Sequence, residues 1–86
     1  EEDKLTLVVL GIRYLMTKDK SKCWAAELDL MSIGTGIKNK MMIFKRVLDK
    51  TPLKVYNIIK VEYKNMRLEK RGQYSNWYLD KYNLVE

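Results

Sequence analysis

Histidine is absent from this chain of 86 residues, and cysteine and proline each occur only once. Without histidine the chain lacks the commonest general base, a usual zinc ligand and any Ser-His-Asp or Cys-His arrangement. Glu27 and Asp29 have the spacing of a carboxylate pair. Such a pair is more often a solvated strand face, and no further acidic residue is placed to complete a site. We therefore predict a non-catalytic binding domain with no catalytic residue, no metal and no cofactor.

Disulfides and long apolar runs are missing as well. Cys23 has no second cysteine to pair with, and a reducing, cytoplasmic setting is the default for such a chain. A membrane span needs about 20 consecutive apolar residues. The longest run, residues 5–12 (LTLVVLGI), is much shorter and follows acidic rather than basic residues, unlike a secretory signal. We expect no membrane partner.

Length and composition indicate one globular domain. Hydrophobic residues make up 47% of the chain and charged residues 33%, which is too apolar for a disordered segment. A chain of this size buries about 60 to 65% of its unfolded surface, so a large enclosed active site is not expected. The first residue is Glu rather than Met. We interpret the chain as an acidic tail, residues 1–4, and one domain, residues 5–86, excised from a longer protein.

Positive charge is in excess and unevenly distributed. The 17 Lys and Arg against 11 Asp and Glu give a net charge of +6. Basic residues gather in segments 13–22, 38–50 and 54–72, while segments 1–4 and 23–30 are acidic. This pattern favours a polyanionic partner. The alternative is that the lysines only solvate a small β-domain.

Five apolar runs have the length and composition of strands, namely residues 5–16, 23–30, 40–45, 55–63 and 75–85. Gly11 predicts a bulge or bend in the first run, and the second alternates with Trp24, Ala26, Leu28 and Leu30 on one face. Residues 46–51 predict a short helix before Pro52. We predict an all-β, five-stranded Greek-key barrel with at most one short helix after strand three, and an SH3-like barrel as the alternative.

Two lysine-rich patches fall between these strands. Residues 17–22 (TKDKSK) join strands one and two, and residues 64–73 (KNMRLEKRGQ) join strands four and five. Turns usually use Gly, Asn, Asp or Pro for backbone geometry, so lysines at these hairpin tips indicate an anionic partner. In a small five-stranded Greek-key barrel, these two loops flank the face that binds oligonucleotides.

The order of these segments resembles a known family. The carriers are residues 8–12 (VVLGI), 16–19 (MTKD), 22–28 (KCWAAEL), 41–45 (MMIFK) and 52–61 (PLKVYNIIKV). They are similar to the OB-fold module of the bacterial DNA polymerase III alpha subunit, in the anticodon-binding-like OB group. The chain departs from the family at residues 28–32 (LDLMS), where Glu-Asp-x-x-Gly is usual, and at Asn57, where Asp is typical. The resemblance implies a non-catalytic OB-fold module that helps hold single-stranded template or tethers a larger replication protein.

Binding of a single strand needs cations along the phosphates and aromatic faces for the bases, each stacked base contributing about 1 to 3 kcal/mol. Arg67 and Arg71 are the strongest candidates, because guanidinium groups bind phosphate through bidentate hydrogen bonds and also stack on bases. Lys38, Lys40 and Arg46 are further cations around strand three. The predicted nucleic-acid-binding residues are Tyr14, Lys18, Lys20, Lys22, Lys45, Lys60, Lys64, Arg67, Lys70, Arg71, Tyr74, Trp77 and Tyr78.

The remaining aromatic residues are assigned by pattern. Trp24 shares the apolar face of strand two, and we expect it and Phe44 in the core. Trp77 and Tyr78 are neighbours on one strand and must point to opposite faces, so we expect one in the core and one exposed.

Two functions follow from these patterns. The first is an OB-fold domain of a DNA replication, repair or mobile-element protein that binds single-stranded DNA, with RNA as the alternative strand and other domains of a replication protein as further partners. The second is a protein-interaction OB module, an adaptor or inhibitor, whose open sheet edge or charged face meets another protein without nucleic acid.

Overall fold

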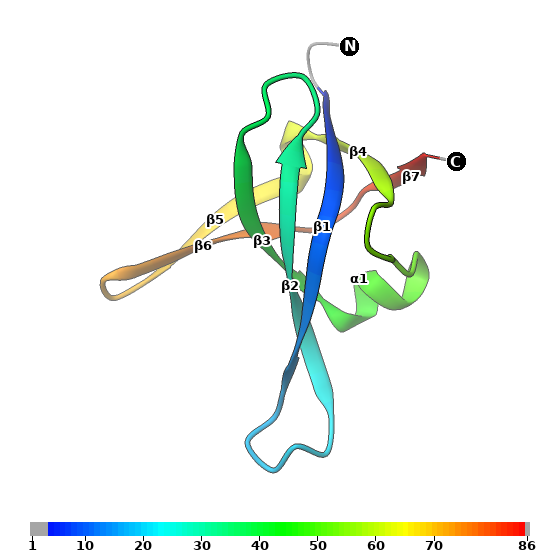
Figure 1. Ribbon diagram of the computed structural model, residues 1–86. Helices are drawn as coiled ribbons and strands as arrows, with labels where there is room; N and C mark the ends of the chain where they lie inside the picture. Colours follow the sequence, from blue (N-terminus) through cyan, green and yellow to red (C-terminus); the bar gives the residue numbers. More distant parts are fainter. Residues whose placement is uncertain (1–3, 86) are drawn as a thin grey trace.

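A curled sheet of seven strands, with one short helix, makes up the fold (Figure 1). The computed structural model describes residues 4–85, and within this range the side chain of Arg71 is left out. The elements in chain order are β1 (Lys4–Met16), β2 (Cys23–Ser32), β3 (Lys38–Phe44), α1 (Lys45–Lys50), β4 (Ile58–Glu62), a 3-10 turn (Tyr63–Asn65), β5 (Met66–Arg71), β6 (Tyr74–Leu79) and β7 (Asn83–Val85).

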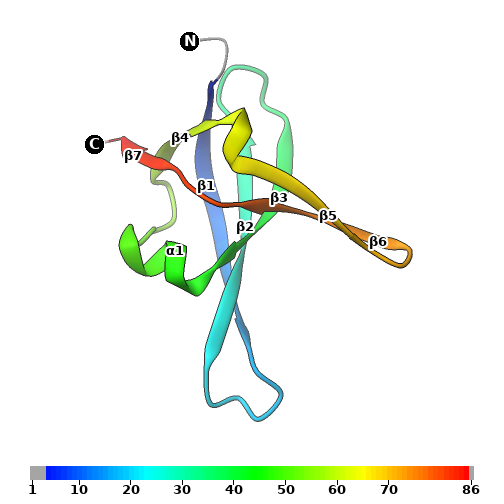
Figure 2. The same cartoon turned by 180° about the vertical axis from the view of Figure 1, so that it is seen from behind.

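The strands lie in the order β5-β6-β3-β2-β1-β4-β7. β1, β2 and β3 form an antiparallel meander, β1 also pairs antiparallel with β4, and β3 pairs parallel with β6. The two ends of this order belong to the same stretch of chain, since β4 runs into β5 through the 3-10 turn and β6 runs into β7. The sheet therefore curls round on itself into a barrel-like shape (Figure 2).

The predicted all-β fold with one short helix after the third strand is confirmed, because α1 begins directly after β3. The strand count differs from the expected five. The predicted fifth strand is interrupted at residues 80–82, which separates β6 from β7. Residues 66–71 were expected in a turn, yet they form β5, since the charged sequence MRLEKR pairs with β6 over its whole length. The turn itself is only Gly72 and Gln73, with Gly72 at the positive φ of 60° that glycine tolerates best.

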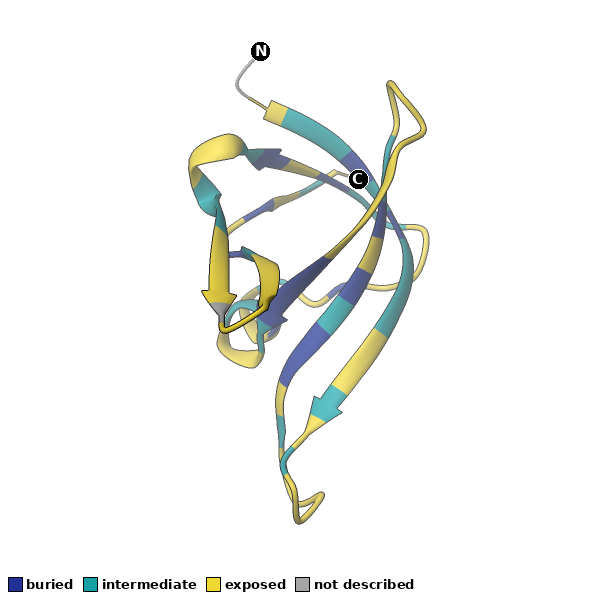
Figure 3. Ribbon diagram, turned by 90° about the vertical axis from the view of Figure 1, so that its left-hand side faces the viewer, coloured by how far each residue is buried: buried dark blue, intermediate teal, exposed yellow. Residues whose placement is uncertain are grey.

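The core lies inside the curl, and alternation along the meander supplies it. Ala26, Leu28 and Leu30 of β2 are fully buried, and Met41 and Ile43 of β3 face them across the strand pair. The other members of this core cluster are Leu7, Val9, Leu48, Leu53, Ile59, Val61, Leu79 and Tyr82, and Ala25 and Met42 are also buried. Figure 3 shows this burial concentrated in the middle of the strands, whereas both hairpin ends are exposed.

Two bulges shape the long β1–β2 hairpin. The register with β2 shifts between Val9 and Gly11, which confirms the predicted irregularity at this glycine. A second shift lies between Leu15 and Met16, where Trp24 is skipped in the pairing. Because an extra residue reverses the alternation of a strand, the expectation that Trp24 lies in the core is wrong, and its side chain is 44% exposed.

The helix α1 fastens the end of β3 to the C-terminal part of the chain. Leu48 is its buried residue, and the Tyr82 hydroxyl donates a hydrogen bond to the Thr51 carbonyl at the end of the helix. Burial of the ring raises the pKa of Tyr82 to about 12, so its hydroxyl stays protonated as a donor. Within residues 4–85 no helix is long and apolar enough to cross a bilayer.

Candidate nucleic-acid interface

Two hairpin ends project from the body of the sheet in different directions (Figure 1). The first arm is the end of the β1–β2 hairpin with its turn, residues 17–22. The second arm is the β5–β6 hairpin, residues 66–79. The lysine-rich patches of the sequence lie on these two arms, so the fold places them at separate exposed ends.

The turn of the first arm is organised by Asp19. Its Oδ1 accepts hydrogen bonds from the Thr17 hydroxyl at 2.6 Å, the Ser21 hydroxyl at 2.7 Å and the Ser21 backbone N–H at 3.0 Å. These bonds favour the carboxylate and lower the pKa of Asp19 to about 2. The turn is therefore fixed by an acidic residue at its centre, while the flanking lysines remain exposed.

The three lysines of this turn, Lys18, Lys20 and Lys22, are all exposed. Lys20 has a φ of 61°, in the left-handed region where glycine or asparagine is the usual choice. Lys20 therefore occupies a turn position that glycine or asparagine would adopt with less strain.

The second arm has two different faces because side chains alternate along its strands. The pair Arg67–Tyr78 and the side chain of Tyr74 define one face, and the pair Leu68–Trp77 defines the other. Tyr74 is 69% exposed and Lys70 is exposed as well. Trp77 is 47% exposed and Tyr78 is only partly buried, so the expectation that one of them lies in the core is wrong. Trp77 is exposed on the face of the arm that no other element of residues 4–85 covers, whereas Tyr78 pairs with Met42 of β3 and is partly covered by Phe44 on the outer face of the sheet.

Aromatic rings and guanidinium groups form a stack where the second arm meets β3. The rings of Phe44 and Tyr78 are stacked, with centroids 5.3 Å apart and planes at 25°. The Cζ of Arg67 lies 5.1 Å from the centroid of Tyr78, and the Cζ of Arg46 lies 5.7 Å from that of Phe44. Both distances are within the range of cation–π attraction. Phe44 is half-buried in this stack rather than in the core, which corrects the expectation for it.

Trp24 extends this stack toward the first arm. Its ring centroid is 6.4 Å from that of Phe44, at an angle of 49°. We call Trp24, Phe44 and Tyr78 with Arg46 and Arg67 the aromatic row. It runs from the second residue of β2, next to the first arm, to β5 in the second arm. The row lies on the outer face of the sheet. Tyr78 pairs with Met42, whereas the neighbours Met41 and Ile43 face inward. The row thus joins the bases of the two arms.

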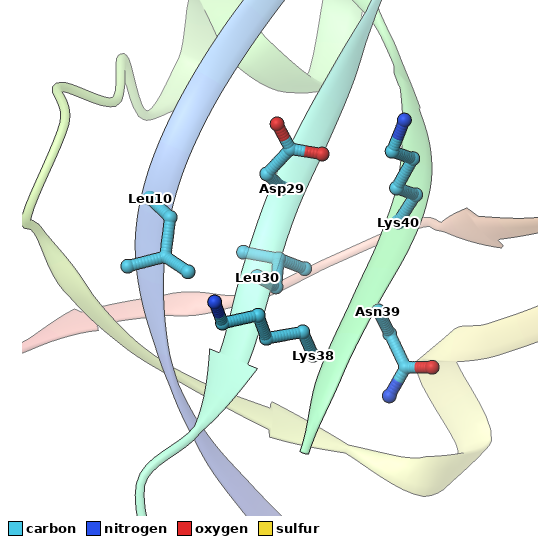
Figure 4. A pocket seen from close by; sticks show the side chains of 6 residues that line it. All are labelled: Leu10, Asp29, Leu30, Lys38, Asn39 and Lys40. Carbon is cyan, nitrogen blue, oxygen red and sulfur yellow. The ribbon is translucent and has the colours of Figure 1, made fainter. Parts of the chain in front are cut away.

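Charges beside the aromatic row are mixed. Arg13 and Glu27 form an ion pair of 2.9 Å on β1 and β2. Farther along the same sheet face, an open hollow of about 480 Å³ is lined by Leu10, Asp29, Leu30, Lys38, Asn39 and Lys40. Figure 4 shows Lys38 and Lys40 on β3 beside Asp29 on β2. The middle of this face therefore carries both signs, and most of its unpaired positive charge comes from β3 and the arms.

Several predicted cations are already paired with carboxylates. Arg67 Nε lies 2.8 Å from Asp80 Oδ2, its Nη1 contacts Glu69, and these acidic groups raise the pKa of Arg67. Lys45 Nζ lies 2.9 Å from Asp49 Oδ1, and this hydrogen bond raises the pKa of Lys45. Lys64 lies 3.5 Å from Glu62.

Other predicted residues lie away from the row. Lys60 is on β4, which Figure 1 shows on the side of the molecule opposite to the tip of the second arm. Tyr14 is 55% exposed and lines a hollow of about 490 Å³ between the first arm and α1, together with Met16, Cys23, Lys45, Leu48, Asp49, Pro52 and Leu53. Trp77 is on the other face of the second arm, and the side chain of Arg71 lies outside the described part of the structure.

The thirteen predicted residues therefore do not form one surface. The structure groups Lys18, Lys20 and Lys22 on one arm and Arg67, Lys70, Tyr74 and Tyr78 on the other. It adds Trp24 and Phe44, which the sequence pattern assigned to the core, and it gives Arg46 a contact with Phe44. No local signal marks Trp24, since its exposure depends on a bulge in the pairing of two strands.

Among residues 4–85, no group of three or more His, Cys, Asp or Glu side chains is arranged to hold a metal ion. Comparison of the chain with protein-family models, with curated proteins and with solved structures gave no match.

Proposed function

We propose that the chain is an OB-fold domain that binds single-stranded DNA, from a DNA replication, repair or mobile-element protein. The strand connections support the OB assignment. β4 and β5 can be counted as one interrupted strand, and β6 and β7 as another. The chain then has a three-strand meander, a fourth strand that pairs with β1 and a fifth strand parallel to β3. These connections support a five-stranded Greek-key barrel as the underlying arrangement. The resemblance to the OB module of the bacterial polymerase III alpha subunit agrees with it.

The aromatic row carries the functional part of the proposal. Exposed rings on the outer face of a sheet, between two cationic hairpin ends, are the combination that sequence-tolerant binding of a single strand requires. Trp24 is the most open ring of the row, with 44% of its surface exposed. Phe44 and Tyr78 already stack on each other and are flanked by Arg46 and Arg67.

This geometry assigns different roles along the row. Trp24 offers a ring face on which one base stacks, for a gain of about 1 to 3 kcal/mol. Arg67 keeps Tyr78 in place and is itself held by Asp80. The exposed lysines of the first arm attract the phosphates, because none of them forms an ion pair with a carboxylate among residues 4–85.

The two tryptophans allow a direct test. Trp77→Phe leaves Trp24 as the reporter on the row, and Trp24→Phe leaves Trp77 as the reporter on the opposite face of the second arm. We expect oligo-dT to quench the fluorescence of Trp24 and to leave that of Trp77 nearly unchanged. The logarithm of the binding constant should fall with the logarithm of salt concentration at a slope of about −0.7 for each phosphate neutralised.

An equal response of both tryptophans, or binding that ignores salt, would contradict this placement of the strand. Oligo-rU in the same titration distinguishes RNA from DNA as the preferred strand. Since the row offers ring faces rather than a hydrogen-bonding site for a 2′-hydroxyl, we expect the two strands to bind with similar affinity.

The hollow beside Tyr14 favours a second function, that of a protein-interaction module. Its lining combines the exposed Tyr14 and Met16 with Leu48, Pro52 and Leu53. Apolar surface of this kind is more typical of protein contacts than of phosphate contacts. If neither oligo-dT nor oligo-rU binds in a salt-sensitive manner, this hollow supports the protein-interaction function in place of the first.

A further inference from the structure

The outer edge of β5 has no neighbouring strand. In the sheet order of residues 4–85, β5 is terminal and pairs only with β6. Figure 1 shows the second arm extending away from the body of the sheet, so the edge is open along the arm. An open edge presents backbone N–H and C=O groups at strand spacing, which only another extended strand can satisfy in series.

An apolar pair lies beside this edge. Leu68 of β5 and Trp77 of β6 are direct cross-strand partners, and they are 43% and 47% exposed. They share the arm face that points away from the aromatic row, because Arg67 and Tyr78 occupy the other face. This apolar pair has no role in the proposed nucleic-acid interface.

The charges of β5 are arranged symmetrically about Leu68. Charged side chains on an edge strand usually discourage pairing with another chain. Here Arg67 precedes Leu68 and Glu69 follows it, so the two charges have opposite sign. A strand of this pattern is complementary to its own reverse.

We propose that β5 pairs antiparallel with β5 of a second copy of this chain, about a twofold axis at Leu68. In this register Leu68 faces the second copy's Leu68. Arg67, which contacts Glu69 within its own chain, also faces the second copy's Glu69. The twofold axis repeats the Arg–Glu contact, as in any interface that uses the same patch on both subunits. On the other face of the joined sheet, Trp77 and Leu68 of the two copies form one continuous apolar stripe.

Neighbouring registers lack this match. A shift by one residue places Arg67 opposite Lys70 and Leu68 opposite Glu69, and a shift by two residues in the same direction places Glu69 opposite itself. Like charges directly opposite on neighbouring strands are destabilising. The charge pattern therefore selects the register centred on Leu68.

The interface is small, since it consists of one six-residue strand and the adjacent Trp77. It lies below the size of a standard stable interface, so the dimer forms and dissociates with concentration. This inference does not depend on nucleic-acid binding.

Thiol crosslinking tests the register in the otherwise complete chain. In a Cys23→Ser background, Leu68→Cys brings two thiols together at the twofold axis, within the Cα separation of a disulfide. Lys70→Cys is the matched control on the same strand and the same face. Its two copies are four residues apart along the paired strands, about 14 Å, which no disulfide bridges.

We expect the Leu68→Cys variant to form a covalent dimer under mild oxidation and the Lys70→Cys variant to stay monomeric. Similar crosslinking of both variants, or faster crosslinking of the control, would overturn the register. Leu68 is on the surface, so its replacement leaves the core intact, and circular dichroism of each variant checks this.

Sedimentation velocity tests the association itself. The unmodified chain should shift from 10.3 kDa toward twice that mass as its concentration rises. Glu69→Lys should weaken the dimer by about tenfold, because it sets like charges opposite each other twice. Asp29→Lys makes the same charge change on β2 and should leave the dimer unaffected. A chain that stays monomeric at millimolar concentration would disprove the proposal.

Discussion

The two arms of this molecule are both rich in cations, yet their charges are in different states. On the first arm, the lysines surround a turn that Asp19 fixes through three hydrogen bonds, and they remain exposed. On the second arm, Arg67 binds Asp80 and Glu69 and stacks on Tyr78. The comparison teaches that a guanidinium group, favoured on chemical grounds as a phosphate ligand, here forms ion pairs within the protein, whereas the lysines of the first arm are exposed.

The largest test of this difference removes the charge of the first arm. The triple replacement of Lys18, Lys20 and Lys22 by Gln should weaken binding of oligo-dT by about a hundredfold and reduce the salt slope by about 2. Replacement of Lys54, Lys60 and Lys81 by Gln makes the same change of net charge away from the aromatic row. If this control loses as much affinity as the first variant, net charge rather than the first arm governs binding.

A smaller effect is expected from the ring that lies between the arms. Trp24→Ala should weaken binding by about tenfold, since it removes one stacked base, and it should leave the salt slope unchanged. Trp77→Ala is the matched control, because it deletes an equally exposed tryptophan on the opposite face of the second arm. Fluorescence anisotropy of a labelled oligonucleotide measures both variants. An equal loss for the two would mean that the row is not the stacking platform.

A still smaller effect on binding is expected at the second arm itself. Arg67→Gln should change affinity by less than about twofold, because the charge that it removes is already paired with Asp80 and Glu69. The same variant should lower the midpoint of urea unfolding, since Asp80 loses its partner and Tyr78 its cation. A fall in the salt slope of about 0.7 would show instead that Arg67 contacts a phosphate.

The smallest expected effect is a pKa change in the turn of the first arm. Asp19 has a pKa of about 2 in the fold, below its ordinary value of 3.8, so its hydrogen bonds stabilise the turn above about pH 4 and are lost as the pH falls through 2. Thr17→Val removes the first of these bonds and should raise the pKa of Asp19 toward 3.8. Carboxyl carbon chemical shifts in a pH titration measure it. An unchanged pKa would show that Thr17 does not fix the turn.

The sequence predicts those parts of the fold that local pattern controls. Alternation identifies Ala26, Leu28 and Leu30 as core, and Pro52 indicates the end of the helix that follows β3. Gly11 marks the irregular pairing in β1. In each case the residue type alone restricts the backbone conformation or determines which face of the element is buried.

The local sequence pattern does not predict the aromatic row, because residues 24, 44 and 78 come together only through pairing between strands. Trp24 is exposed only because the register with β1 skips it. β5 looked like a turn since its charges resemble those of a loop, and only pairing with β6 makes it a strand. Trp77 is exposed on the projecting arm, and Tyr78 stacks on Phe44 at the outer face of the sheet, because pairing of β6 with β3 turns its ring away from the inner core.

The parallel contact between β3 and β6 has a consequence for how the chain folds. Its register holds one residue pair, Met42 with Tyr78, which are far apart in the sequence. The β1–β2–β3 meander and the β5–β6 hairpin each pair residues that are close along the chain, so their contacts form at lower entropic cost. We therefore expect the two to behave as separate cooperative units, with the hairpin docking late. In native-state hydrogen exchange, the amides of β5 and β6 should open at lower free energy than those of β2.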